Sequence, residues 1–126
     1  SEDRPLASSI YYLLKAGQVS KLHRLKADEL WLYHCGTPLL IHQIDEVGAL
    51  STARLGLAVD RGELPQVLVT GNRIFGAELA EPKGFCLVSC VVSPGFDYRD
   101  FELFSGSELS RLYPQHADLI QRLNGQ

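Results

Sequence analysis

The chain has 126 residues, of which 45% are hydrophobic and 21% are charged, and its formal net charge is −3 at pH 7. We expect a single domain over residues 1–126, large enough to bury about two-thirds of its unfolded surface without a disulfide or a metal. A mildly acidic chain lacks the basic surface that a phosphate backbone requires, so nucleic acid is excluded as a partner. No apolar run approaches the ~20 residues that span a bilayer, and the first residues carry no signal-peptide pattern, so we expect no membrane partner and a cytoplasmic location.

Eight segments with alternating or continuous apolar character predict β-strands. They are IYYLL from Ile10, VSKLHRL from Val19, ELWLYHC from Glu29, PLLIHQI from Pro38, LSTARLGL from Leu50, QVLVT from Gln66, RIFGAEL from Arg73 and FCLVSCVV from Phe85. Short connections rich in Gly, Pro, Asn and Asp separate them, as tight turns require. The pattern predicts an all-β barrel or sandwich.

The C-terminal tail, SGSELSRLYPQHADLIQRLN, changes to helical spacing of its apolar residues. Ser107 is the predicted N-cap of a first helix, and Pro114 is placed to begin a second. We therefore expect two short helices after the last strand.

The stretch HRLKADELWLYHCG, residues 23–36, holds the candidate functional side chains. Alternate residues of a strand share a face. One face then carries Glu29, Trp31, Tyr33 and Cys35, and the other carries Leu30, Leu32 and His34. The preceding strand places Val19, Lys21, His23 and Leu25 on one face, and a short turn would fold His23 against Glu29. Because polar tips at successive positions need partners, this face is predicted to form the wall of a pocket.

The three cysteines, Cys35, Cys86 and Cys90, lie in apolar strand-like sequence without C-x-x-C spacing. Their odd number and their surroundings predict buried, reduced thiols.

Four fragments carry a resemblance to a known family, and together they span nearly the whole chain. They are IYYLL, HRLKADELWLYHCG, PQVLVTGNRIFGAEL from Pro65 and SPGFDYRDFEL from Ser93. The chain resembles the cupin superfamily, and more closely a group of short cupins sometimes called cupin family five, similar in fold to the dTDP-sugar epimerases. The resemblance implies a double-stranded β-helix, or jelly-roll barrel.

The resemblance also implies where a metal would bind. Metal-binding cupins pair two histidines and a glutamate in a first motif with a third histidine in a second motif. Here Lys21 stands two residues before His23, and Ile74 stands where the third histidine would be expected. Two of the four ligands are missing, so we expect no metal and no other cofactor.

By analogy with the sugar epimerases, a histidine base and a tyrosine acid would act from opposite sides of a sugar ring. His23 would be the base, Glu29 would orient it, and Tyr33 or Tyr98 would be the acid. Ligand contacts would come from Arg24, Trp31 and Gln66. The structural alternative is a core histidine with its ion-pair partner, surrounded by packing aromatics.

Two classes of function follow. The first is a metal-independent epimerase or isomerase acting on a carbohydrate-like substrate, with a sugar or sugar nucleotide as ligand. The second is a non-catalytic barrel that binds a small molecule. A metal-dependent dioxygenase comes third, because Lys21 and Ile74 replace ligands.

The remaining histidines and the N-terminal strand are predicted to have structural roles or to form a contact between chains. His42 is predicted to be a partly buried structural residue, and His116 to face solvent. The predicted strand at residues 10–14 is too apolar for an exposed sheet edge, so we expect a homodimer that pairs through it.

Overall fold

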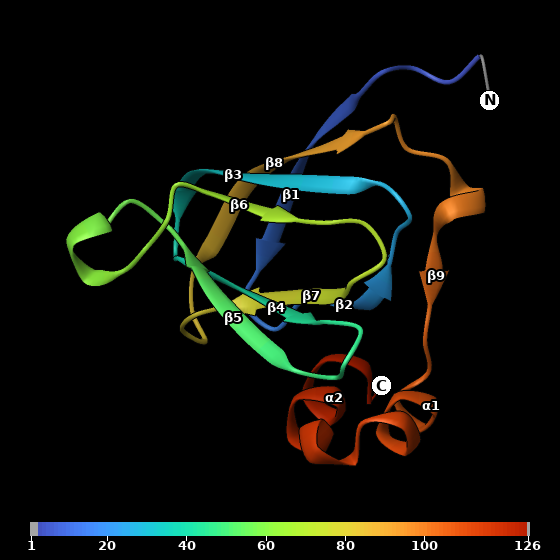
Figure 1. Cartoon of the computed structure of the whole chain (residues 1–126). Helices are drawn as coiled ribbons and strands as arrows, with labels where there is room; N and C mark the ends of the chain where they lie inside the picture. The colour runs from blue at the N-terminus through green and yellow to red at the C-terminus, as the bar shows by residue number, and fades with distance from the viewer. Residues whose placement is uncertain (1–2, 126) are drawn as a thin grey trace.

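The computed structural model describes residues 3–125, which form two antiparallel sheets facing each other, with helices packed outside the second (Figure 1). The first sheet has the strand order β1-β8-β3-β6, and the second has the order β5-β4-β7-β2-β9. Within the described residues the strands are β1 (Ser8–Lys15), β2 (Val19–Arg24), β3 (Asp28–Gly36), β4 (Leu39–Ile44), β5 (Leu50–Leu55), β6 (Gln66–Val69), β7 (Ile74–Leu79), β8 (Phe85–Ser93) and β9 (Glu102–Leu103).

The helical elements are few and short. The α-helices are α1 (Gly106–Leu112) and α2 (Ala117–Asn124), and the 3₁₀ turns are η1 (Val59–Arg61), η2 (Tyr98–Asp100) and η3 (Pro114–His116). No helix within residues 3–125 is long and apolar enough to cross a membrane.

The predicted fold class is confirmed: all eight expected strands are present, in a jelly-roll barrel with two short C-terminal helices. The two-residue strand β9 was not expected. The N-cap of α1 is Ser105, whose Oγ accepts a hydrogen bond from the Glu108 amide at 3.1 Å, so the prediction of Ser107 is wrong by two positions. Pro114 begins η3, which leads directly into α2.

The main core fills the space between the two sheets. Trp31 and Phe75 are its largest fully buried side chains, and their rings meet edge to face at 6.4 Å. Strand alternation brings them there, since inward residues of β3 and β7 face each other across the barrel.

A second core lies between the outer side of the second sheet and the C-terminal helices (Figure 1). Leu22, Ile44 and Ile74 project from the strands into this layer, and their main partners in α1 and α2 are Leu109, Ile120 and Leu123. Strands β4 and β7 therefore contribute apolar side chains to both cores, whereas β5 at the sheet edge is mostly exposed.

A bulge in β2 connects these two cores. The register with β7 shifts between Ser20 and His23, and the backbone of Leu22 bonds instead to the side chain of Asn124. The Leu22 amide donates to Asn124 Oδ1 at 2.7 Å, while Asn124 Nδ2 donates to the carbonyl oxygens of Leu22 at 3.1 Å and Phe104 at 3.0 Å. One buried side-chain amide thus replaces the missing strand partner, as buried peptide groups require.

The bulge changes which β2 side chains share a face. His23 and Leu25 face the barrel interior as expected, but Val19 packs against the helical core and Lys21 is exposed. The expectation that all four share one face is therefore wrong, because the extra residue reverses the alternation before His23.

The cysteines divide between interior and surface. Cys86 and Cys90 are buried, and burial raises the pKa of Cys86 to about 11. Cys35 is exposed, contrary to expectation, because the register of β3 with β8 shifts between Tyr33 and Cys35.

Candidate functional site

A cavity of about 390 Å³ opens at one end of the barrel. Residues of β1, β2, β3 and β8 form its walls, and the loop after β8 forms its rim. The walls are mainly apolar, and His23 and Glu29 are the groups on them that titrate near neutral pH. Hollows of similar size beside α2 are shallow surface depressions, so the barrel cavity is the candidate site.

His23 is held by its backbone and by two aromatic rings. Nδ1 lies 2.7 Å from the Lys21 carbonyl oxygen, and because a carbonyl only accepts, Nδ1 carries the proton. The imidazole packs against Phe75 at 4.2 Å and Phe101 at 5.3 Å between ring centroids. Burial lowers its pKa, and the Lys21 carbonyl offsets part of that effect. The ring is therefore neutral at pH 7, with Nε2 free to accept a proton.

Glu29 is a buried carboxyl group near the start of β3, with 9% of its surface exposed. Burial raises its pKa to about 7, and the nearby Trp31 indole lowers it by a smaller amount. The indole N–H does not reach good hydrogen-bonding geometry with any acceptor in the described chain. Glu29 in turn contributes to the raised pKa values of Tyr12 and Cys90, which places all three in one interior environment.

His23 and Glu29 line the same cavity, as predicted, but they do not form the expected pair. The orienting contact to His23 comes from the Lys21 carbonyl, and the pKa of His23 is set by burial and that carbonyl. Glu29 is thus available to act on a ligand directly.

Of the two candidate tyrosines, the structure brings one to the cavity. Tyr98 lies in η2 at the rim, where its ring meets Phe96 edge to face at 4.9 Å. Its side chain is 81% exposed, so its hydroxyl is accessible. Tyr33 lies outside the cavity lining, and its hydroxyl donates to the Gly36 carbonyl at 2.5 Å.

The expected ligand contacts lie elsewhere. Arg24 alternates with His23 and faces outward, where it pairs with Glu102 at 2.7 Å and lies over the Phe104 ring. Gln66 is exposed at the start of β6. Trp31 is in the core behind the cavity, so these three assignments as ligand contacts are not supported.

The other histidines are structural. His34 lies on the outer face of its sheet, as predicted, with Nε2 2.6 Å from Ser89 Oγ. His42 is buried between Thr52 and Glu78, both at 2.8 Å. His116 is only partly exposed, contrary to expectation, because Nε2 donates to the Gly48 carbonyl at 2.8 Å.

The rim aromatics Phe96 and Phe101 were not predicted as site residues. They flank Tyr98 in the stretch SPGFDYRDFEL, and the clustering of three aromatic residues in this short loop was the available signal. Tyr12 lies outside the cavity lining, opposite Val88 of β8 and against the Trp31 ring, and Glu29 contributes to its raised pKa.

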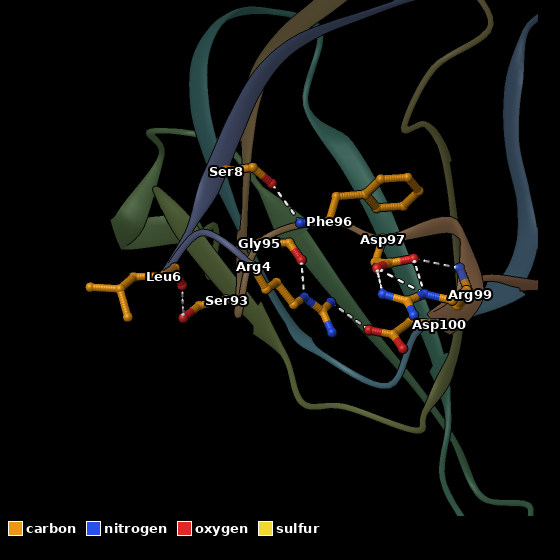
Figure 2. A network of polar contacts seen from close by, with 9 residues as sticks. All are labelled: Arg4, Leu6, Ser8, Ser93, Gly95, Phe96, Asp97, Arg99 and Asp100. Carbon is orange, nitrogen blue, oxygen red and sulfur yellow. Dashed lines mark hydrogen bonds and ion pairs between the residues drawn. The ribbon is translucent and has the colours of Figure 1, made fainter. Parts of the chain in front are cut away.

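The rim loop is fastened to the N-terminal segment (Figure 2). Arg4 Nε donates to the Gly95 carbonyl at 2.6 Å, and its guanidinium forms an ion pair with Asp100. Backbone and hydroxyl contacts continue the attachment: the Gly95 amide donates to Pro5, Ser93 Oγ donates to Leu6, and the Phe96 amide donates to Ser8 Oγ, each at 2.9 Å. We call these contacts the N-terminal clasp. They hold the loop that carries the three rim aromatics.

The residues at the cavity do not match a cupin metal site. Within residues 3–125 no three His, Cys, Asp or Glu side chains lie close enough together to hold a metal ion. Ile74, expected at the position of the third histidine, packs under the helices, and Phe75 is the β7 residue beside His23. Two donors, His23 and Glu29, fall short of the three protein ligands that a catalytic metal usually has.

Comparison with known proteins agrees with this fold. A protein from Shewanella oneidensis matches with 50% identity and a TM-score of 0.94, over 98% of this chain and 78% of that chain. Oxalate decarboxylase from Bacillus subtilis matches with 16% identity and a TM-score of 0.66, over 97% of this chain and 32% of that chain. A dTDP sugar isomerase from Desulfovibrio desulfuricans matches with 11% identity and a TM-score of 0.64, over 79% of this chain and 65% of that chain.

At these low identities the last two proteins are evidence for the fold alone. No curated protein matches the chain. The model of the family described as Cupin superfamily (DUF985) matches residues 1–104, so the chain belongs to this cupin family.

Proposed function

We propose that the barrel cavity binds a small oxygenated, carbohydrate-like molecule and isomerises or epimerises it by metal-independent acid–base chemistry. The observation that carries this proposal is the state of His23, which is half-buried in the cavity wall, neutral at pH 7, and has Nδ1 already bonded to the Lys21 carbonyl. Its Nε2 is therefore a general base held in one orientation. The fold that the chain shares with a dTDP sugar isomerase is supporting analogy only.

The reaction needs a carbon acid next to a carbonyl group. His23 Nε2 takes the proton, and the electron pair of the C–H bond moves onto the carbonyl oxygen as an enolate. Tyr98 at the rim returns a proton to the other face of that carbon, and solvent then resets both side chains. Glu29 holds the substrate by accepting its hydrogen bonds, since His23 is already oriented by Lys21.

Proton exchange tests this chemistry. The protein is incubated in deuterated water with aldoses, ketoses and keto-sugar nucleotides, and NMR follows loss of the carbon-bound proton. We expect exchange with the wild-type protein and at least a hundredfold slower exchange with His23→Gln, since general bases contribute about 10²–10⁴-fold. His34→Gln, on the outer face, is the matched control and should exchange at the wild-type rate.

The second candidate is a barrel that binds without catalysis. It is favoured by the exposure of Tyr98, which leaves the acid with no defined contact to the cavity interior. Binding of a panel compound without exchange would support this candidate over the isomerase. Equal exchange by wild type and His23→Gln would contradict the role of His23.

A further inference from the structure

We propose that the cavity selects a small organic cation, with an ammonium or amidinium group bound at Glu29 and an apolar body between the rim aromatics. This rests on the proposed function, because it names the substrate class of the same cavity: a small molecule that carries an amine.

The first argument is the imbalance between acceptors and donors on the cavity wall. Glu29 and His23 Nε2 are its strongest acceptors, and Glu29 is nine-tenths buried with the poorly aligned Trp31 indole as its nearby donor. The available donors at the rim are neutral hydroxyl groups, those of Ser8 and Tyr98. A ligand that brings several N–H donors would satisfy both acceptors, which water or a hydroxyl ligand does less well.

The second argument is charge. No Lys or Arg of the described chain lines the cavity. Three arginines that lie near the lining residues in the sequence form ion pairs outside the cavity: Arg4 with Asp100, Arg24 with Glu102 and Arg99 with Asp97. A carboxylate buried without a basic partner is costly, so a cation from the ligand offers the compensation that the protein does not.

The third argument is the aromatic rim. Phe96, Tyr98 and Phe101 surround the opening, with ring centroids 4.9 Å apart for Phe96 and Tyr98, and 6.4 Å apart for Phe96 and Phe101. Ring faces carry negative electrostatic potential and attract organic cations. Aromatic faces around a single acid are complementary to an amine with an apolar body.

The same features oppose anionic ligands. A nucleotide diphosphate or a dicarboxylate needs cationic side chains, and it would meet the Glu29 carboxylate instead. The cavity therefore differs in charge preference from what a sugar nucleotide or oxalate requires.

Three probes of one shape test the proposal: benzylamine, benzyl alcohol and benzoate, titrated by calorimetry at pH 8. We expect benzylamine to bind at least tenfold more tightly than benzyl alcohol, and benzoate to bind most weakly. Glu29→Gln should weaken benzylamine at least tenfold and leave benzyl alcohol within about twofold. Glu81→Gln removes the same charge from an exposed position and should bind all three as wild type does.

A second measurement on the wild-type protein guards against misfolding of the variant. Affinity for benzylamine should rise with pH through about 7, where Glu29 becomes ionised, while affinity for benzyl alcohol stays flat. The other titratable groups that face this space are His23 from β2, Cys90 from β8 and Tyr98 from the rim, and Tyr12 from β1 lies near Glu29 outside the lining. The pKa of His23 is lowered and the pKa values of Tyr12 and Cys90 are raised, so each is shifted away from the pH at which Glu29 ionises.

The outcomes separate this proposal from the proposed function. Benzoate binding as tightly as benzylamine, or benzylamine binding equally to wild type and Glu29→Gln, would overturn the cation preference. Proton exchange on a neutral sugar, without benzylamine binding, would overturn it while the isomerase stands. Glu29-dependent benzylamine binding, with no exchange on any amine-bearing carbonyl compound, would support the cation site and remove the isomerase.

Discussion

At the scale of single residues, Glu29 links the cavity to the stability of the fold. Burial raises its pKa from the ordinary 4.5 to about 7. Between these two pH values the folded protein keeps a proton on Glu29 that the unfolded chain has released. The contribution of Glu29 to stability is therefore fully present below pH 4.5 and is lost as pH rises through 7. At pH 8 the loss amounts to roughly 3 kcal/mol, because raising a pKa by one corresponds to about 1.4 kcal/mol.

Glu29→Gln should therefore raise the free energy of unfolding at pH 8 and change it little at pH 5. Urea denaturation at both pH values measures this. Glu63→Gln is the control of opposite sign, because Arg54 holds the pKa of Glu63 below its usual range. That variant should lower the stability at pH 8. A Glu29→Gln variant that is less stable than wild type at pH 8 would contradict the buried, unpaired state of the carboxyl group.

His23 provides a second measurement at this scale. Its burial against Phe75 and Phe101 predicts an NMR titration midpoint below the ordinary value of 6.5. His34→Ala should leave that midpoint unchanged, since His34 lies on the outer face of the first sheet. A midpoint above 6.5 would show that the ring is solvated or paired with an anion, and would remove the argument for a neutral base.

At the scale of elements, the N-terminal clasp is a connection that local sequence does not reveal. Arg4 and Gly95 are 91 residues apart, yet the clasp determines where the rim loop lies (Figure 2). Arg4→Ala removes the contacts to Gly95 and Asp100 and should speed amide hydrogen exchange in residues 95–101 at least tenfold. Exchange in β4 and β7 should stay as in wild type.

The matched control for the clasp is Arg54→Ala, which breaks an arginine–carboxylate pair far from the rim loop. It should leave exchange in residues 95–101 unchanged. If Arg4→Ala also leaves that segment protected, the remaining contacts to Pro5, Leu6 and Ser8 hold the loop without the guanidinium.

The strands could be predicted because apolar and polar residues alternate along them as the side chains alternate between the inner and the outer face. Trp31 and His34, on opposite faces of β3, show this. The bulge in β2 could not be predicted, because it depends on the Asn124 side chain, 102 residues from Leu22. The incorrect assignment of Arg24 and Gln66 as ligand contacts has a similar cause. Both are polar residues near the quoted motifs, but the assembled sheets turn them away from the cavity. His23 and Glu29 were found because a buried acid and imidazole are unusual in any strand.

At the scale of the whole molecule, the C-terminal helices reach the site through β2. Asn124 at the end of α2 satisfies the bulge at Leu22, and His23 follows directly with its ring in the cavity. The helical tail is thus part of the support of the candidate base. No pattern within the tail itself indicates this, since α2 reads as an ordinary amphipathic helix.

The outer face of the first sheet remains uncovered, in contrast to the second sheet. The apolar strand that motivated the dimer prediction is an edge strand, because β1 pairs with β8 along one side and has no strand partner on its other side within the described residues. The outer face of this sheet is also apolar. Its exposed members are Tyr11 at 78%, Leu13 at 49%, Leu68 at 52% and Phe85 at 43%. Leu13 lies opposite Leu87, and Leu30 lies between Val91 and Leu68, so the register joins these side chains into one patch.

We propose that two copies of the chain associate through this face. A contiguous apolar patch of this kind is rare on monomers, and burying it between two copies removes it from water. Light scattering at high micromolar concentration should give twice the 14.0 kDa chain mass. Leu13→Glu places a charge on the β1 side of the patch and should yield monomers, because association would bury that charge in an apolar contact. Leu57→Glu changes another exposed leucine, outside the patch, and should remain dimeric. If the wild-type protein has the mass of one chain, two copies do not associate through this face. If the Leu13→Glu variant is still dimeric, the contact lies on a different surface.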